Sequence, residues 1–234
     1  MSTTSGKAGN WTKLNRQIVN CERCPRLRNY CRRIAQEKRR AFAQWDYWGR
    51  PLPNFGDNKA RLLIVGLAPA AHGGNRTGRM FTGDRSGDWL YRALFKAGFA
   101  TQPQSVSRDD ELQLLDCAIT AVAHCAPPDN KPTPREIANC QAWLNQTVDL
   151  LNPHVMLALG QIGFRATVAQ AKRRGWYSGP LPKFDHGAVV KFNERRWLLA
   201  SYHPSQQNTF TGKLTEAMFD RVFAKARKIL DSIA

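Results

Sequence analysis

The chain is short of acidic residues. Of its 234 residues, 18 are Asp or Glu and 35 are Lys or Arg, which gives a formal net charge of +17 at pH 7. A net charge this far from zero creates a long-range positive field that attracts polyanions. Because hydrophobic residues make up 42% and charged residues 23% of the chain, the composition is that of a globular protein. Nucleic acid is therefore the first class of partner that the composition indicates.

Long apolar segments are also missing. The longest apolar run, at residues 62–71, is broken by Gly66 and Pro69 and is too short for a membrane span of ~20 residues. The N-terminal stretch MSTTSGKAGN carries no export signal, lipidation signal or basic amphipathic pattern. We therefore expect a soluble, cytoplasmic protein that binds no membrane and reaches the nucleoid through DNA. We also expect it to be a monomer.

Standard nucleotide-binding motifs are absent as well. Residues 66–87 form a long glycine-rich stretch, but it contains neither the G-x-G-x-x-G pattern of dinucleotide-binding folds nor a Walker motif. Repeated glycines still allow the backbone to approach a ligand closely. The stretch thus indicates a binding loop of another kind.

Apolar and amphipathic segments alternate along the chain. Residues 61–66 form an apolar run ended by glycine, which is typical of a strand buried on both faces of a parallel sheet. The other segments are strands at 114–123 and 154–159, a strand pair at 187–193 and 196–201, and helices at 88–97, 134–151, 161–174 and 211–233. This alternation predicts one domain, residues 1–234, with a three-layer α/β/α sandwich fold around a mainly parallel sheet.

The sequence also gives expectations for the N-terminal part and for three loops. Residues 1–10 are small and polar, and we expect them to be flexible, whereas residues 11–50 are basic and helix-compatible. Ligands of parallel sheets bind beyond the carboxyl ends of the strands. The loops that begin at Leu67, Ala126 and Tyr202 should therefore meet in one cleft.

Four of the six cysteines have ligand-like spacing. They form two pairs, Cys21 with Cys24 in a C-x2-C arrangement, and Cys125 with Cys140 across a proline-rich loop. In a chain that is not exported, such pairs indicate a metal site before they indicate disulfides. Four thiolates suit zinc or an iron–sulfur cluster, and spacing alone does not separate the two. Four buried structural thiols are the alternative, and we interpret Cys31 and Cys117 as packed thiols.

Two side chains in the loops could bind a ligand or take part in a reaction. Phe81 offers an aromatic face on which a flat ligand could stack, although a core position is equally consistent with its sequence context. His203 follows an apolar strand, where its ring could donate a hydrogen bond to charge developing on a leaving group. A lone histidine is more often structural, so neither residue identifies a function by itself.

Several separated motifs together resemble the uracil-DNA glycosylase superfamily. They are Gly-Leu-Ala-Pro-Ala at 66–70, Gly-Arg-Met-Phe-Thr-Gly at 78–83, His-Pro-Ser at 203–205 and the two cysteine pairs. The match is closest to the iron–sulfur branch called family 5, or type b, and extends from Cys21 to the last helix. The resemblance implies a glycosylase fold and a [4Fe–4S] cluster on Cys21, Cys24, Cys125 and Cys140.

The resemblance also implies residue roles. Phe81 matches the aromatic residue that stacks on the extruded base, and His203 matches the histidine that stabilises the leaving base anion. The segment that enters the minor groove and fills the gap left by the flipped nucleotide corresponds to Ser205, Gln206, Gln207 and Asn208. We expect DNA containing uracil to be the partner.

The sequence departs from the family pattern at the acidic position of the first motif, because Leu67 and Ala68 are apolar. Asp84 is our candidate for orienting the attacking water, and a helix cap is the competing interpretation of this residue. Asn130 is assigned with it to the catalytic group. Residues expected to contact the base with Phe81 are Ala68, His72 and Asn75.

A second departure concerns substrate choice. Relatives strict for uracil carry a base-reading asparagine after the second strand, where this chain has Ile119-Thr120-Ala121. Losing a base-reading amide relaxes specificity. We therefore expect activity on uracil and on other deaminated or alkylated bases such as hypoxanthine.

Three functions remain open at this point. The leading hypothesis is a monofunctional glycosylase that leaves an abasic site, since none of the three loops places a lysine where the family would use an amine nucleophile. The alternatives are a non-catalytic iron–sulfur module that binds damaged or single-stranded DNA, and a zinc-stabilised nucleic-acid adaptor.

Overall fold

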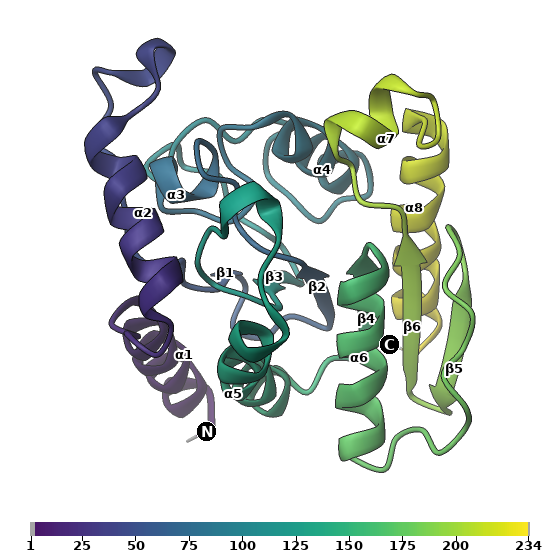
Figure 1. Ribbon diagram of the computed structural model, residues 1–234. Helices are drawn as coiled ribbons and strands as arrows, with labels where there is room; N and C mark the ends of the chain where they lie inside the picture. Colours follow the sequence, from purple (N-terminus) through teal and green to yellow (C-terminus); the bar gives the residue numbers. More distant parts are fainter. Residues whose placement is uncertain (1–2, 234) are drawn as a thin grey trace.

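A six-stranded sheet forms the centre of the molecule (Figure 1). The computed structural model describes residues 3–233, with side chains from residue 6 onward. In the order of their pairing, the strands are β1 (Phe55–Gly56), β3 (Cys117–Ala121), β2 (Leu62–Gly66), β4 (Val155–Leu159), β6 (Arg196–Ser201) and β5 (Val189–Asn193). The four inner strands are parallel, and the edge strands β1 and β5 are antiparallel. The mainly parallel sheet is confirmed.

Helices surround this sheet. They are α1 (Thr3–Val19), α2 (Pro25–Glu37), α3 (Gly74–Thr77), α4 (Arg85–Lys96), α5 (Pro134–Leu151), α6 (Gln161–Arg173), α7 (Gln206–Phe210) and α8 (Glu216–Ser232), with 3₁₀ turns η1 (Arg40–Phe42) and η2 (Pro128–Asn130). None of the helices in residues 3–233 combines the length and apolar character that a membrane span requires.

Side chains of the inner strands alternate between two apolar layers because successive residues of a strand point to opposite faces. In β2, Leu62 and Ile64 join the core under α4 and α8, whereas Leu63 and Val65 join the core under α1, α5 and α6. All five residues of β2 are buried, as they are in β3 and β4. The structure therefore has the three predicted layers, α/β/α.

Two helix boundaries differ from the sequence-based expectation. Residues 1–10 were expected to be flexible, but residues 3–10 extend α1, which is anchored by the buried side chains of Trp11, Leu14 and Ile18. Residues 1–2 lie outside the described part of the chain. The helix expected at 211–233 begins only at Glu216, because Gly212 has a φ of +69° and the Thr215 side chain caps the helix start.

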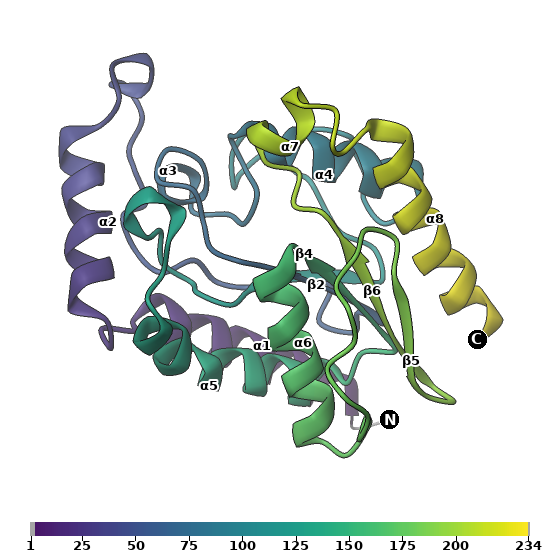
Figure 2. The same cartoon turned by 45° about the vertical axis from the view of Figure 1, so that its right-hand side comes forward.

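Helix α2, in the basic N-terminal part, lies beside the sheet. Figure 2 shows α2 as a separate column next to the sheet and its covering helices. Arg26 on α2 binds Glu136 on α5 through two hydrogen bonds of 2.8 and 2.7 Å. Glu136 also completes the predicted capping box with Thr133, which starts α5. The Glu136 carboxylate thus caps the start of α5 and also holds α2 against α5.

Candidate active site

A cavity of about 940 Å³ lies beyond the carboxyl ends of the parallel strands. Its wall includes the end of β2 and the loop after it, the residues after β3 around η2, and the residues after β6. The sequence predicted that these three loops meet in one cleft, and this is confirmed. Parallel pairing brings the ends of β2, β3, β4 and β6 to the same edge of the sheet.

Phe81 and His203 share this cavity, although they lie on different loops. Their ring centroids are 5.8 Å apart with an interplanar angle of 28°, so the rings are stacked. Burial lowers the pKa of His203 to about 4, because the protein interior disfavours the charged ring. The imidazole is therefore neutral at neutral pH and carries one N–H donor.

The backbone around Phe81 is held in an unusual shape. Phe81 has a φ of +54°, in the left-handed region that non-glycine residues seldom adopt. Gly66 and Gly87 lie so close to Phe81 that neither position has room for a larger side chain. A Cβ on Gly66 would lie 2.9 Å from the Phe81 ring, and one on Gly87 would overlap the Phe81 carbonyl oxygen. The Tyr91 hydroxyl donates a 2.6 Å hydrogen bond to the Met80 carbonyl just before it.

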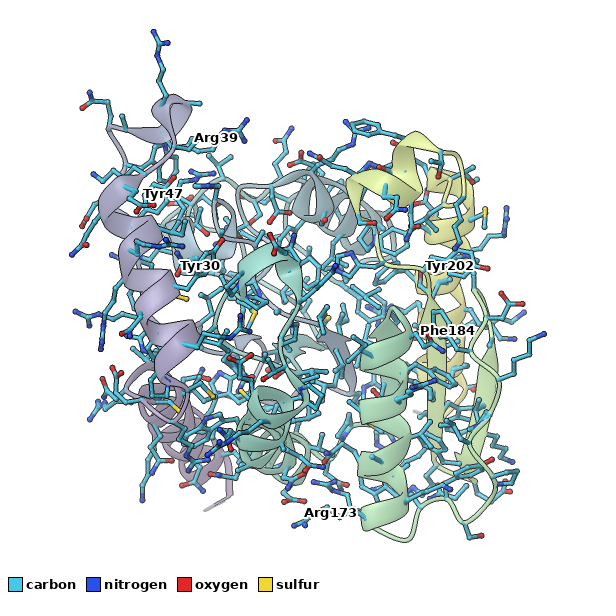
Figure 3. All side chains as sticks on the ribbon, in the orientation of Figure 1. Tyr30, Arg39, Tyr47, Arg173, Phe184 and Tyr202 are labelled. Carbon is cyan, nitrogen blue, oxygen red and sulfur yellow. The ribbon has the colours of Figure 1, made fainter. Side chains whose placement is uncertain are left out.

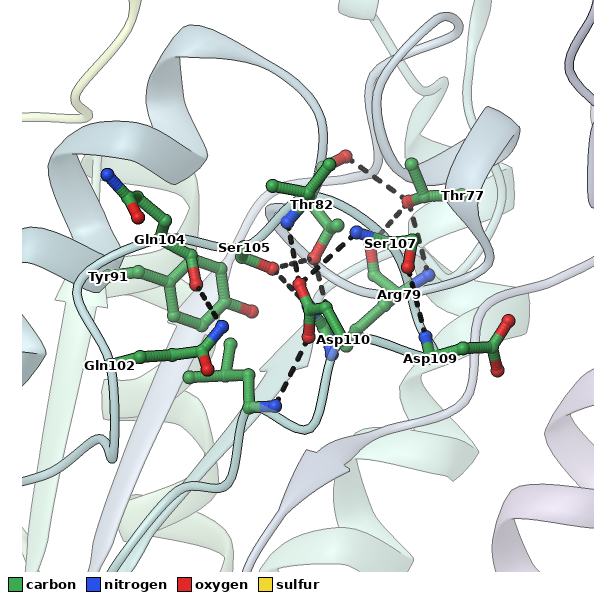
Figure 4. A network of polar contacts seen from close by, with 12 residues as sticks. Thr77, Arg79, Thr82, Tyr91, Gln102, Gln104, Ser105, Ser107, Asp109 and Asp110 are labelled. Atoms are coloured by element: carbon green, nitrogen blue, oxygen red, sulfur yellow. Dashed lines mark hydrogen bonds and ion pairs between the residues drawn. The ribbon is translucent and has the colours of Figure 1, made fainter.

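A buried polar network holds the residues on either side of Phe81 in place (Figure 4). Arg79 is 4% exposed and donates to the Thr82 hydroxyl at 3.0 Å and to the Asp110 carboxylate at 2.7 Å. The Thr82 and Ser105 hydroxyls are 2.6 Å apart. These bonds tie the segment around Phe81 to the loop that precedes β3. Backbone strain at a binding residue persists only where the surroundings fix it in this way.

Asp84 fits both of its sequence-based interpretations. Its side chain accepts a hydrogen bond from the Gly87 backbone N–H at 3.1 Å and thereby caps α4. The same carboxylate lines the cavity and packs against the backbone of Gly73. Burial raises the pKa of Asp84, while hydrogen bonds from backbone N–H groups and the positive charge of Arg76 oppose that rise. Partial desolvation makes this carboxylate a stronger base than a free one.

Arg76 connects the two ends of the loop that carries this carboxylate. Its Nε donates to the His72 carbonyl and its Nη2 to the Gly83 carbonyl, each at 2.8 Å. The guanidinium carbon lies 3.9 Å from the ring centroid of Phe42 and 4.1 Å from that of Trp45. The loop at η1 is thereby attached to the cavity wall.

Most of the remaining site candidates lie at the cavity. Ala68, His72 and Asn130 line it, and the His72 ring is hydrogen-bonded to the Tyr47 hydroxyl at 3.1 Å. Asn75 does not: it is fully buried and donates from Nδ2 to the carbonyls of Cys31 and Ala71. Its amide N–H groups hold α2 against the loop, and contact of this residue with the base stays a prediction.

Three members of the expected DNA-contacting segment line the cavity rim, namely Ser205, Gln206 and Gln207. Ser205 caps the short helix α7 by accepting a bond from the Asn208 N–H. Asn208 donates from Nδ2 to the His203 carbonyl at 2.9 Å. Its side chain thus holds the histidine backbone, a role that the sequence did not indicate.

The sequence-based interpretation missed several wall residues. They are Tyr30, Arg39 and Phe42 from the N-terminal part, and Asp129 from η2. Tyr30, Arg39 and Tyr47 lie on the α2 side of the molecule in Figure 3, across from Tyr202. No local pattern marks Tyr30, Arg39 or Phe42, because their contact with the cavity depends on how α2 and the turn after it pack. Asp129 is a second carboxylate at the site and has a left-handed backbone, with a φ of +53°.

The four cysteines with ligand-like spacing line a second, narrow cavity between α2, α5 and the segment after β3. The His124 N–H donates to Cys140 Sγ at 3.4 Å, and the Asn139 side chain donates to Cys24 Sγ at 3.6 Å. Within residues 3–233, no three Cys, His, Asp or Glu side chains converge on a point suited to one metal ion. Cys31 and Cys117 are buried, as expected of packed thiols.

Comparison with known proteins gives one family. The model of the uracil DNA glycosylase superfamily matches residues 53–227. A type-5 uracil-DNA glycosylase of Mycobacterium leprae is 49% identical over 231 residues, covering 96% of this chain and 98% of that protein. One from Pyrobaculum aerophilum is 46% identical over 210 residues, covering 90% and 89%. A type-4 enzyme from the same organism is 30% identical over 195 residues, covering 82% of each. The chain therefore belongs to the uracil-DNA glycosylase superfamily, in its type-5 branch.

Proposed function

We propose that this protein is a DNA-repair glycosylase that hydrolyses the N-glycosidic bond of uracil in DNA and leaves an abasic site. The observation that carries the proposal is the meeting of Phe81, Asp84 and His203 in one cavity from distant parts of the chain. The names of the type-5 relatives support it. A non-catalytic DNA-binding module is not favoured, since it would need neither a buried neutral imidazole nor a desolvated carboxylate.

Access to the bond requires the nucleotide to leave the base stack, which costs a few kcal/mol. The cavity wall combines the Phe81 ring with the apolar residues Ala68 and Pro69, so an extruded base replaces stacking lost in the duplex. In this proposal Gln206 and Gln207, which line the cavity, enter the space that the base vacates. The net charge of +17 provides the attraction to the phosphate backbone.

Cleavage separates charge, and two side chains fit the two charges. The electron pair of the glycosidic bond stays on the base, and the neutral His203 ring stabilises that anion through an N–H hydrogen bond. Water attacks the cationic sugar carbon, and Asp84 accepts the proton that the water loses. The released base takes up a proton from solvent. The cavity wall within residues 3–233 contains no lysine, which supports hydrolysis without a covalent amine intermediate.

Among residues 3–233, the cavity wall lacks at the end of β3 the amide side chain that reads the base in enzymes strict for uracil. Ala121 lines the cavity at the end of β3, where an amide would otherwise read the base. An apolar residue there neither pairs with uracil nor leaves a buried polar group unsatisfied by another base. We therefore include hypoxanthine and other deaminated or alkylated bases among the substrates, and we retain the expectation of a cytoplasmic monomer.

A [4Fe–4S] cluster on Cys21, Cys24, Cys125 and Cys140 belongs to the proposal. Four thiolates around one cavity are a suitable donor set. A single tetrahedral zinc ion needs all four sulfurs about 2.3 Å from one point, whereas a cluster spreads its ligands around several irons. The resemblance of the two cysteine pairs to those of the iron–sulfur branch supports the cluster over zinc. Bound there, the cluster would cross-link α2 to α5 and to the segment after β3.

The first test is excision itself. Purified, cluster-loaded protein should convert a uracil-containing oligonucleotide into an alkali-labile product, and should produce no strand break before alkali. A thymine-containing oligonucleotide is the matched control. The same gel assay with hypoxanthine tests substrate range separately. No alkali-labile product from the uracil strand would end the glycosylase proposal.

Asp84→Asn should lower the single-turnover rate about 100-fold or more, because the amide cannot accept a proton from water. Asparagine is also a good helix cap, so the fold is retained. Asp88→Asn, in the first turn of the same helix, is the control and should keep the wild-type rate. If Asp84→Asn keeps that rate and Asp129→Asn loses it, the water is assigned to the wrong carboxylate.

The imidazole of His203 should titrate far below an ordinary histidine. We expect a folded-state pKa of about 4 by NMR, identified by the resonance missing from His203→Ala, against ~6.5 in urea. Between these values the unfolded chain binds a proton that the folded chain does not, so this group lowers stability as pH falls through that window. A folded-state midpoint well above pH 7 would contradict the neutral-donor role, because the ring would then be mostly protonated at neutral pH.

Metal analysis tests the cluster. Loaded wild-type protein should be brown and contain about four irons per chain. Cys125→Ser should lose iron and soluble yield, because ligand loss uncouples the segments that the cluster joins. Cys117→Ala, within β3 and away from the cavity, should keep its iron. Colourless protein with one zinc per chain would contradict the cluster and leave the glycosylase proposal standing.

A further inference from the structure

Trp143 has a buried hydrogen-bond donor without a partner. The residue lies on α5, one turn after Cys140, and is 6% exposed. Its indole Nε1 is buried and makes no hydrogen bond among the described residues. Tryptophan can only donate at this atom. A buried, unpaired N–H is costly and calls for an acceptor that the protein atoms do not supply.

The place of this donor identifies the acceptor. Trp143 lines the same narrow cavity as Cys21, Cys24, Cys125 and Cys140. The sulfides and thiolates of an iron–sulfur cluster accept hydrogen bonds, and the number of such bonds is one determinant of the reduction potential. Two N–H groups already point at cysteine sulfurs, those of the His124 backbone and the Asn139 side chain.

His124 carries the other unpaired polar atom of this cavity, but it has the opposite character. Its Nδ1 lies 2.7 Å from the Leu52 carbonyl oxygen, which can only accept, so Nδ1 holds the proton. Its Nε2 is then a lone pair without a partner. A lone pair cannot donate to a sulfur. Trp143 is therefore the unpaired side chain of this cavity that fits a cluster.

The charge near the indole strengthens the donor. The Arg23 guanidinium lies 4.5 Å from the Trp143 ring centroid, in cation–π geometry. A positive charge over the ring draws electron density from the indole and makes its N–H a better donor. Arg23 is one of the two residues between Cys21 and Cys24, so the loop that would supply two ligands also places this charge.

We propose that the Trp143 indole N–H donates a hydrogen bond to a sulfur of the [4Fe–4S] cluster, and that this bond raises the reduction potential and slows oxidative loss of the cluster. The inference rests on the cluster proposed above and extends it beyond the four ligands. A hydrogen bond withdraws charge from the sulfur, so it stabilises the reduced, more negative cluster more than the oxidised one.

Trp143→Phe removes the N–H and keeps an apolar aromatic ring. The expected result is an iron content equal to that of the wild type, a more negative midpoint potential in an EPR-monitored redox titration, and several-fold faster bleaching in air. Trp176→Phe, beyond the far end of α6, is the control and should match the wild type in all three measurements. A Trp143→Phe protein with wild-type potential and bleaching rate would overturn the inference, as expected if a buried water is the true acceptor.

A second measurement tests the inference on the wild-type protein, in case the Trp143→Phe variant does not bind iron. Wild-type protein labelled with indole-¹⁵N tryptophan should show ¹⁵N hyperfine coupling in the paramagnetic state of the cluster, and the exchangeable indole proton should disappear in D₂O. If neither the ¹⁵N coupling nor the exchangeable proton is detected in iron-loaded protein, the inference is overturned and the cluster proposal is not. Wild-type protein without iron would overturn the cluster and this inference together, whereas uracil excision would be judged by its own assay.

Discussion

Parallel pairing of β2 with β3 and β4, and of β4 with β6, is the constraint on which the rest of the structure depends. Because all four strands end at the same edge of the sheet, the segments after β2, β3 and β6 have to meet there. Asp84 and His203 are more than a hundred residues apart in the sequence, yet they face one cavity. The two apolar layers that bury the inner strands thus also determine where the chemistry takes place.

Desolvation shifts the pKa values of the two polar groups of the site in opposite directions. It lowers the pKa of His203, so the ring is a neutral donor, and it raises the pKa of Asp84, so the carboxylate is a better base. In the proposed reaction, one physical cause therefore prepares both partners of the charge separation. Arg76 limits the effect on Asp84 through its positive charge, and it also fixes the backbone that carries this residue.

The cysteine cavity connects segments that the sheet does not hold. α2 contacts the rest of the protein through the Arg26–Glu136 pair, the Asn75 amide and the surroundings of the four cysteines. Because Tyr30 and Arg39 reach the active-site wall from α2 and the turn after it, the position of that helix contributes to the shape of the base pocket. The four cysteines and the active-site cavity are coupled in this way through one helix.

The sequence by itself determined the layered fold and the inner strands through apolar periodicity, and the start of α5 through cap spacing. Its family motifs singled out Phe81, Asp84 and His203 as site candidates, and all three line the cavity. Periodicity, cap spacing and motifs are local properties of the chain, so they can be recognised without the fold. The sequence also grouped the four cysteines in two pairs. Only the tertiary structure decided that Asn75 faces α2, that Asn208 holds the His203 backbone, and that Asp129 and Arg39 join the wall. Those outcomes depend on packing between distant segments and on burial, neither of which a local pattern records.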